Sequence, residues 1–273
     1  MCRSSALAPG KKRESRGEKK MKLTKQYLWI SALVLVCSTL TASQSYAVLI
    51  DLGPGSFTPA ASVITFSEVS LGTVNPVYNF TAVPGLGNVT VSFEGFFVGQ
   101  AACSPCFPVT LADHTPAAGP LALDPAAPNT FTVNDSANAT SPVLSGTPTF
   151  NGPISVLFSV PVAGVGLKGG FFDALHSTTI EAYDANGNIL GSITNSVTGF
   201  EFYGLADSTG GNVIQGISFF ITGNEPAGFA IDNLTFGDAG AIVPITTKVP
   251  EPSPLILVGM GLLGLARFIR RKR

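Results

Sequence analysis

Short runs of alternating apolar and polar residues fill the chain between residues 48 and 249 and restrict its fold class more than any other feature. The expected strands cover residues 62–67, 88–94, 129–134, 154–160, 178–184, 189–194, 200–203, 213–222 and 228–236. No stretch between the two chain ends has a convincing helical period of about 3.6 residues. Glycine, asparagine and proline separate the runs, as in sheets whose strands are joined by tight turns. The sequence therefore predicts an all-β domain, a β-sandwich of jelly-roll type with Greek-key or jelly-roll connections.

The clearest hairpin covers residues 179–193. Asn186 and Gly187 lie between its two alternating runs and predict a type I′ turn, which needs positive φ at both central residues. Asp184, Asn186 and Asn188 also resemble the start of a calcium-binding loop. Ile189 stands where that loop needs glycine, so the turn is the favoured interpretation.

The N-terminal end is typical of a secretory signal, which adds a signal helix to the predicted fold. After Met21 and a short basic stretch, an apolar run covers residues 27–40. Ser45 and Ala47 occupy the minus-three and minus-one positions of a cleavage site after Ala47. Residues 1–20 are highly basic, so they form either an over-long n-region or a spurious extension, and Met21 is the favoured start. The signal segment thus covers residues 1–47 and predicts export through the Sec translocon.

The C-terminal end, residues 244–273, combines a rigid tripeptide, an apolar helix and a basic cluster. The tripeptide is Pro250, Glu251 and Pro252. The helix covers residues 255–269, including Arg267, and is shorter than the roughly 20 residues that span a bilayer. Arg270, Arg271, Lys272 and Arg273 follow it and would stay on the cytoplasmic side. The segment predicts a single short transmembrane helix; the alternative is a buried helix of a soluble domain.

This order of tripeptide, apolar helix and basic end resembles the PEP-CTERM sorting signal of Gram-negative bacteria. The resemblance implies that exosortase, a membrane protease-transpeptidase, processes the tail at Pro250–Pro252. It also implies a transient anchor in the inner membrane, then release to the cell surface or to an extracellular polysaccharide matrix such as that of a biofilm.

The exported part, residues 48–249, is strongly acidic. Fourteen carboxylates oppose Lys168 and Lys248, a formal balance of −12. Nucleic acid is excluded as a partner because phosphate binding requires a basic surface. Acidic side chains are compatible with calcium, although solubility is the simpler explanation for most of them.

Two of the four cysteines remain after signal removal, Cys103 and Cys106. In an oxidising compartment their spacing predicts a structural disulfide, with redox or metal chemistry as the weaker alternative. They begin a proline- and alanine-rich stretch, residues 101–150, which we expect to be a long surface excursion from the domain at 48–243. Long loops often carry binding sites.

The second half of the chain resembles the lectin-like jelly-roll domains found upstream of PEP-CTERM tails. The motifs are residues 165–173, the 183–191 hairpin, and residues 200–204, 217–220 and 229–236. In related carbohydrate-binding sandwiches an Asp-Asn pair and an acid near the first strand hold a structural calcium. The resemblance assigns these roles to Asp232 and Glu68. The alternative is that Asp232 and Asn233 only end a turn.

Catalytic motifs are missing from the sequence. There is no G-x-S-x-G or H-E-x-x-H pattern, and His114 and His176 stand alone. The leading hypothesis is a non-enzymatic exported surface or matrix protein. A carbohydrate-binding module with a structural calcium is the alternative, although the mature chain contains no tryptophan. A glycan hydrolase or lyase is less favoured, because only the number of carboxylates suggests it.

Overall fold

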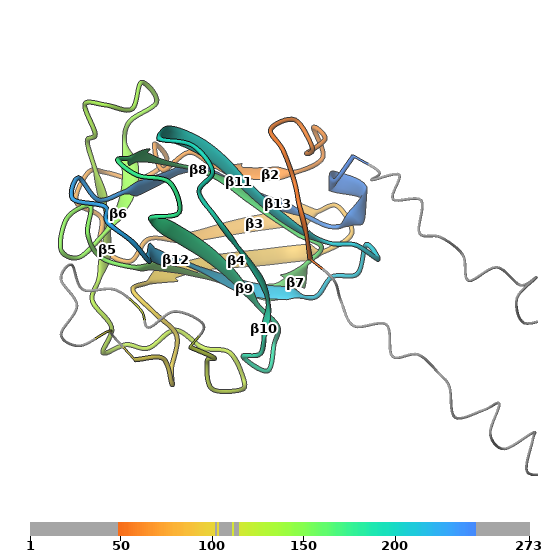
Figure 1. The fold of residues 1–273 in the computed structure, drawn as a ribbon. Coiled ribbons are helices and arrows are strands. Elements are labelled where there is room, and N and C mark those ends of the chain that lie inside the picture. The colour runs from red at the N-terminus through yellow and green to blue at the C-terminus, as the bar shows by residue number, and fades with distance from the viewer. Residues whose placement is uncertain (1–48, 102, 104–110, 112–114, 244–273) are drawn as a thin grey trace, which may run out of the picture. The chain divides into compact units, whose positions relative to one another are not determined.

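The computed structural model describes residues 49–101, 103, 111 and 115–243 (Figure 1). The predicted signal helix and the apolar helix at 255–269 lie outside these residues. Within them, no helix is long and apolar enough to cross a membrane. The regular structure consists of β-strands and one short 3₁₀ helix, η1 (Ala239–Ala241).

The strands form two antiparallel sheets. The seven-stranded sheet has the order β1 (Leu49–Asp51), β11 (Gly199–Asp207), β8 (Gly164–Phe172), β13 (Ala230–Gly237), β6 (Val143–Gly146) and β5 (Thr130–Val133), and β2 (Ser62–Ile64) also pairs with β13. The six-stranded sheet has the order β10 (Ile189–Thr194), β9 (Thr178–Tyr183), β12 (Ile214–Ile221), β7 (Ile154–Val162), β4 (Gly87–Glu94) and β3 (Val77–Val83). Consecutive strands lie in different sheets except for the pairs β1–β2, β3–β4, β5–β6 and β9–β10.

One hydrophobic core lies between the two sheets. Buried residues of the seven-stranded sheet, such as Leu167 and Phe236, share a cluster with Phe158 and Ile217 of the six-stranded sheet. The rings of Phe158 and Phe236 lie 5.2 Å apart across the interface. This two-layer packing confirms the predicted all-β class and the β-sandwich.

Most strands coincide with the alternating runs in the sequence, but β1, β3, β6 and β8 were not predicted. The central strand β8 contains four glycines, a composition that weakens any strand prediction. The strand contains glycines because aromatic rings from other segments lie against it. A Cβ atom on Gly166 would lie 2.5 Å from Phe202 Cζ and 2.7 Å from Phe57 Cε2. The glycine lets rings from neighbouring segments lie directly on the strand.

The 179–193 hairpin forms, but its turn differs from the prediction. Gly187 has φ +81°, whereas Asn186 is not among the residues with positive φ, so the turn is not type I′. The Asp184 carboxylate accepts hydrogen bonds from the backbone N–H groups of Asn186 and Asn188, at 2.8 and 2.9 Å. This side-chain cap stabilises a longer loop that needs left-handed backbone only at the glycine.

The expected surface excursion at 101–150 is also only partly correct. Strands β5 and β6 pair within the seven-stranded sheet, and all four residues of β6 are buried. Leu121, from the same stretch, packs with Phe97 and Tyr183 in a small separate core. The described prolines of this stretch lie outside β5 and β6, and their frequency hid the contribution of the stretch to the sheet.

Candidate functional site

The loop between β5 and β6 lies against the seven-stranded sheet and carries one side of the candidate site. Asp232 of β13 is 1% exposed, and its carboxylate holds the loop in place. It accepts hydrogen bonds from Asn138 Nδ2 at 3.1 Å and from the Thr140 hydroxyl. The Asn233 backbone N–H and side-chain amide also donate to it, at 2.7 and 3.1 Å. Asp232 therefore anchors the residues that follow Asp135.

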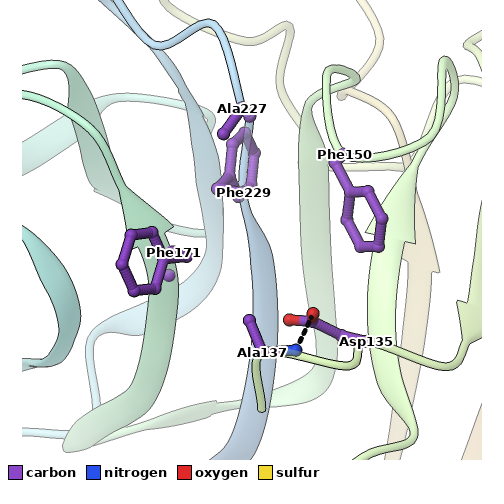
Figure 2. Close-up of a pocket in the computed structure, with 8 residues that line it drawn as sticks. Asp135, Ala137, Phe150, Phe171, Ala227 and Phe229 are labelled. Atoms are coloured by element: carbon purple, nitrogen blue, oxygen red, sulfur yellow. Dashed lines mark hydrogen bonds between the residues drawn. The ribbon is translucent and has the colours of Figure 1, made fainter.

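A cavity of about 260 Å³ lies beside this loop (Figure 2). Figure 2 shows Phe171 on one side of it and Phe150 and Asp135 on the other, with Phe229 between them. The described residues that line it are Asp135, Ala137, Phe150, Gly170, Phe171, Ala227, Gly228 and Phe229. Phe171 is 48% exposed, an unusual position for such a large apolar ring. The cavity thus joins aromatic surface to a single carboxylate; we call it the Asp135 cavity.

Backbone hydrogen bonds fix the Phe150 side of this cavity. The Phe150 N–H donates to the Ser145 hydroxyl at 2.7 Å, and its carbonyl accepts from the Phe229 N–H at 2.6 Å. Gly228 (φ +75°) must be glycine here, because a Cβ atom would lie 1.8 Å from the Phe150 carbonyl oxygen. The connection between β6 and β7, which carries Phe150, and the segment just before β13 are therefore in direct contact.

The opposite wall is stabilised by two acidic residues. Glu225 is 2% exposed and accepts hydrogen bonds from the Asp173 N–H, at 2.8 and 3.1 Å to its two oxygens. Asp173 in turn accepts a hydrogen bond from the Ala227 N–H at 2.8 Å. Burial raises the pKa of the Glu225 carboxyl, and the nearby Asp173 charge raises it further, against hydrogen bonds that lower it. Hydrogen bonds therefore hold the segment of Asp173 and the segment of Glu225 and Ala227 together beside Phe171.

One of the two carboxylate oxygens of Asp135 already accepts a hydrogen bond from the protein. The Oδ1 atom accepts a hydrogen bond from the Ala137 N–H at 2.9 Å, and the Asp135 N–H donates to the Ser141 hydroxyl at 2.9 Å. Within the part of the chain that the structure describes, we find no hydrogen bond to Oδ2. This oxygen can accept a proton donor from a ligand in the cavity.

A second cavity of about 340 Å³ lies on the same sheet. It is lined by Pro54, Lys168, Phe200, Glu201, Phe202 and Asn233. Lys168 is the single Lys or Arg in the described ranges. Its ammonium group lies 4.6 Å from the centre of the Phe200 ring and donates to Asn138 Oδ1 at 3.2 Å. Phe200 contacts Phe171 edge-on at 5.6 Å, so the two cavities adjoin at this pair of rings.

The two residues predicted to hold calcium are each bound by hydrogen bonds to the protein. Glu68 is exposed, and its Oε1 accepts from the N–H and the hydroxyl of Thr65, both at 2.9 Å. The Asp232 carboxylate receives the four donors given above. Among the described residues no group of three or more His, Cys, Asp or Glu side chains could hold a metal ion. This geometry gives no support to calcium binding by Glu68 and Asp232, which stays a prediction.

Several predicted site residues fall outside the described residues. They are Ser45 and Ala47 of the signal, His114, Cys106, Pro250, Glu251, Pro252 and Arg270, Arg271, Lys272 and Arg273 of the tail. Cys103 is disulfide-bonded, and its pairing with Cys106 stays a prediction. His176 Nδ1 lies 3.0 Å from the Thr194 hydroxyl.

Comparison with known proteins identifies the tail. Residues 248–272 match the PEP-CTERM protein-sorting motif. The chain is therefore a PEP-CTERM sorting domain-containing protein, and the motif implies export and processing by exosortase at a membrane. No curated protein matches the chain.

One similar solved structure is the enzymatically active domain of tailspike protein 4 from bacteriophage CBA120. The match has 14% sequence identity and a TM-score of 0.22, and it covers 64% of this chain and 20% of that one. This chain thus spans only a small part of the tailspike chain. A likeness at this TM-score supports no conclusion about function.

The residues of the Asp135 cavity were not predicted as a site. Asp135 and Phe150 come from the proline-rich stretch, Phe171 from β8 and Phe229 from the connection before β13, so nothing in the sequence shows that they lie together. The one local signal is the Asp-x-Ala-Asn pattern at residues 135–138, which is typical of a side-chain-capped turn.

Proposed function

We propose that this protein is a non-enzymatic, exported component of the cell surface or the extracellular matrix. The match of residues 248–272 to the sorting motif carries the proposal, because it links the chain to an export route that ends in tail processing. In this proposal, Sec exports the chain, and residues 1–47 are then removed by cleavage after Ala47. The apolar helix then holds it transiently in the inner membrane until exosortase acts near Pro250–Pro252.

The acidic balance of the exported part supports an extracellular location with no nucleic acid partner. With −12 charges over residues 48–249, self-repulsion favours solubility after release. The strand order, with its repeated changes between sheets, supports the jelly-roll type within the sandwich class.

Fractionation of producing cells tests the sorting proposal. In a variant with Pro250, Glu251 and Pro252 all replaced by alanine, we expect the full-length chain to accumulate in the inner membrane. The matched control replaces Pro244 and Thr246 with alanine, which changes the same region but leaves the tripeptide intact. Equal surface delivery of both variants would contradict the proposal.

We further propose that the domain binds carbohydrate, because the Asp135 cavity combines an exposed aromatic ring with a free carboxylate oxygen. Sugar sites need an apolar face for the ring and polar groups for the hydroxyls. We expect the full chain to be retained by extracellular polysaccharide of the producing cells, and the Phe171→Ala variant to be retained less. Equal retention of both would count against this site.

A further inference from the structure

We infer that the Asp135 cavity binds an amino sugar unit that carries a free ammonium group, as part of a cationic glycan. The inference rests on the proposed carbohydrate binding and adds the chemical class of the ligand. The charge, the aromatic surface, the size and the rigidity of the cavity support it.

The charge of the lining favours a cationic sugar over an anionic one. Among the described residues, Asp135 is the one charged residue that lines the cavity. Its Oδ2 atom faces no donor in the described part of the chain, and an ammonium group would supply one. Hydrogen bonds between charged partners are about twice as strong as those between neutral groups. The −12 balance of the exported part also attracts cations over a longer range.

The aromatic walls suit the same ligand. Phe171 is 48% exposed, and Phe150 lies across the cavity from it (Figure 2). A cation within about 6 Å of a ring centre is attracted by the ring face, and the C–H groups of a pyranose pack on the same surface. One ligand unit can therefore use the rings and the carboxylate together.

The adjoining cavity shows this chemistry within the protein itself. There the Lys168 ammonium lies 4.6 Å from the centre of the Phe200 ring and is hydrogen-bonded to Asn138. Phe200 contacts Phe171 at 5.6 Å, so an ammonium group already lies on the ring next to Phe171. Lys168 and Asp135 form no ion pair in the described residues, so the Asp135 carboxylate stays available.

Size and rigidity limit the ligand to one ring-sized group at a time. A volume of about 260 Å³ lies below the roughly 300–1,000 Å³ of sites for drug-sized molecules. Asp232 anchors the Asp135 loop, and the Phe150–Phe229 hydrogen bond fixes the segment that carries Phe150. A preformed site of this kind loses little conformational entropy on binding.

Isothermal titration of the full chain in detergent with three hexasaccharides tests the inference. The probes are a glucosamine oligomer, its fully N-acetylated counterpart and an oligogalacturonate. We expect the glucosamine oligomer to bind at least about tenfold more tightly than the N-acetylated one, and the oligogalacturonate not to bind. Equal affinity for the first two would overturn the ammonium assignment but leave carbohydrate binding intact. No binding of any probe would contradict both proposals.

A pair of matched variants separates a specific site from general attraction to an acidic protein. Asp124 has the same side-chain-capped turn as Asp135, with the Ala126 N–H donating to its Oδ1 at 2.8 Å, but does not line the cavity. Asp135→Asn and Asp124→Asn remove one charge each, and asparagine keeps the turn acceptor. We expect about a tenfold loss of glucosamine-oligomer affinity for Asp135→Asn alone. Equal losses in both variants would overturn the inference.

A surface variant keeps the test valid if Asp135→Asn does not fold. Phe171→Ala truncates an exposed ring, and Leu175→Ala, at a residue that is 55% exposed, is its control. We expect about a three- to tenfold affinity loss for Phe171→Ala and none for Leu175→Ala. Unchanged binding by Phe171→Ala would contradict the assignment of the site.

Discussion

At the scale of single residues, Gly228 closes the wall of the Asp135 cavity. Its φ of +75° lies in the left-handed region, and a Cβ atom would collide with the Phe150 carbonyl. Gly72 has almost the same φ, +77°, but no atom within 4 Å of an added Cβ. The two glycines therefore differ in steric surroundings and share their backbone conformation.

This pair gives a direct prediction. Gly72→Ala pays only the cost of the left-handed conformation and should lower the unfolding free energy by about 1–2 kcal/mol. Gly228→Ala adds a backbone collision and should lower it by at least about 3 kcal/mol. Urea denaturation measures both values, and similar values for the two variants would contradict the close contact at Phe150.

For single residues, the sequence predicts local interactions better than it predicts contacts between segments that are distant in the chain. The turn preference of Asp184 over calcium binding follows from its neighbours, and the carboxylate does cap a turn. The cavity around Asp135 instead depends on the β5–β6 loop, the connections before β7 and β13, and strand β8, which approach one another only in the folded sheet. No spacing in the chain encodes that proximity.

At the scale of elements, the loop between β5 and β6 depends on Asp232. The buried carboxylate accepts four hydrogen bonds, two of them from Asn138 and Thr140 of the loop. Asp232→Ala leaves these donors unsatisfied, so we expect a loss of about 3 kcal/mol in unfolding free energy. Asp184 accepts three hydrogen bonds from Asn186 and Asn188 at a more exposed turn. Asp184→Ala should therefore cost about 1 kcal/mol or less, and an equal loss in the two variants would contradict the anchoring role.

The hydrogen bonds of Asp232 also lead to a prediction about the removal of calcium. Because protein donors surround the Asp232 carboxylate, we expect the melting temperature to be unchanged by a calcium chelator. A drop that added calcium restores would contradict this expectation. It would instead favour the structural calcium suggested by the sequence.

Strand prediction succeeded for most strongly alternating runs, and for β8 it failed because glycine replaces the signal. The expected run at 189–194 coincides with β10, whereas the glycine-rich β8 carries too few side chains to show a pattern. The rings that cover β8, such as Phe202, come from neighbouring segments. Their cover is a tertiary property and cannot be predicted from the strand itself.

At the scale of the whole molecule, burial of carboxylates sets the pH dependence of stability. Burial is the largest cause that raises the pKa values of Asp51, Glu94 and Glu225 above their ordinary values of 3.8, 4.5 and 4.5. The folded protein then binds more protons than the unfolded chain between the ordinary and the raised pKa values. Stability contributed by these groups therefore falls as the pH rises through that range. Self-repulsion of the −12 balance acts in the same direction.

We therefore expect a higher melting temperature near about pH 5 than near about pH 7.5. Glu94→Gln should reduce the difference, because it removes the charge from the Glu94 carboxyl, whose Oε2 is buried without a hydrogen-bond partner. Glutamine keeps an acceptor for the Asn75 amide, which donates to Oε1 at 2.7 Å. Calorimetric scans across this range measure the effect. A lower melting temperature at the acidic end would contradict the account.

The last described residues before the tail are held firmly to the domain. The Val243 N–H donates to the Ser56 carbonyl at 2.8 Å, next to the bridge between Phe57 and Ile242. The chain thus leaves the sandwich from a fixed point toward the motif at 248–272.

Mass spectrometry of the mature protein from the cell surface or the culture medium tests the proposed processing of the tail most directly. Exosortase processing predicts that peptides from the sandwich are recovered and that none extends beyond Leu255. Recovery of the C-terminal cluster Arg270–Arg273 on the mature, surface-delivered protein would contradict it.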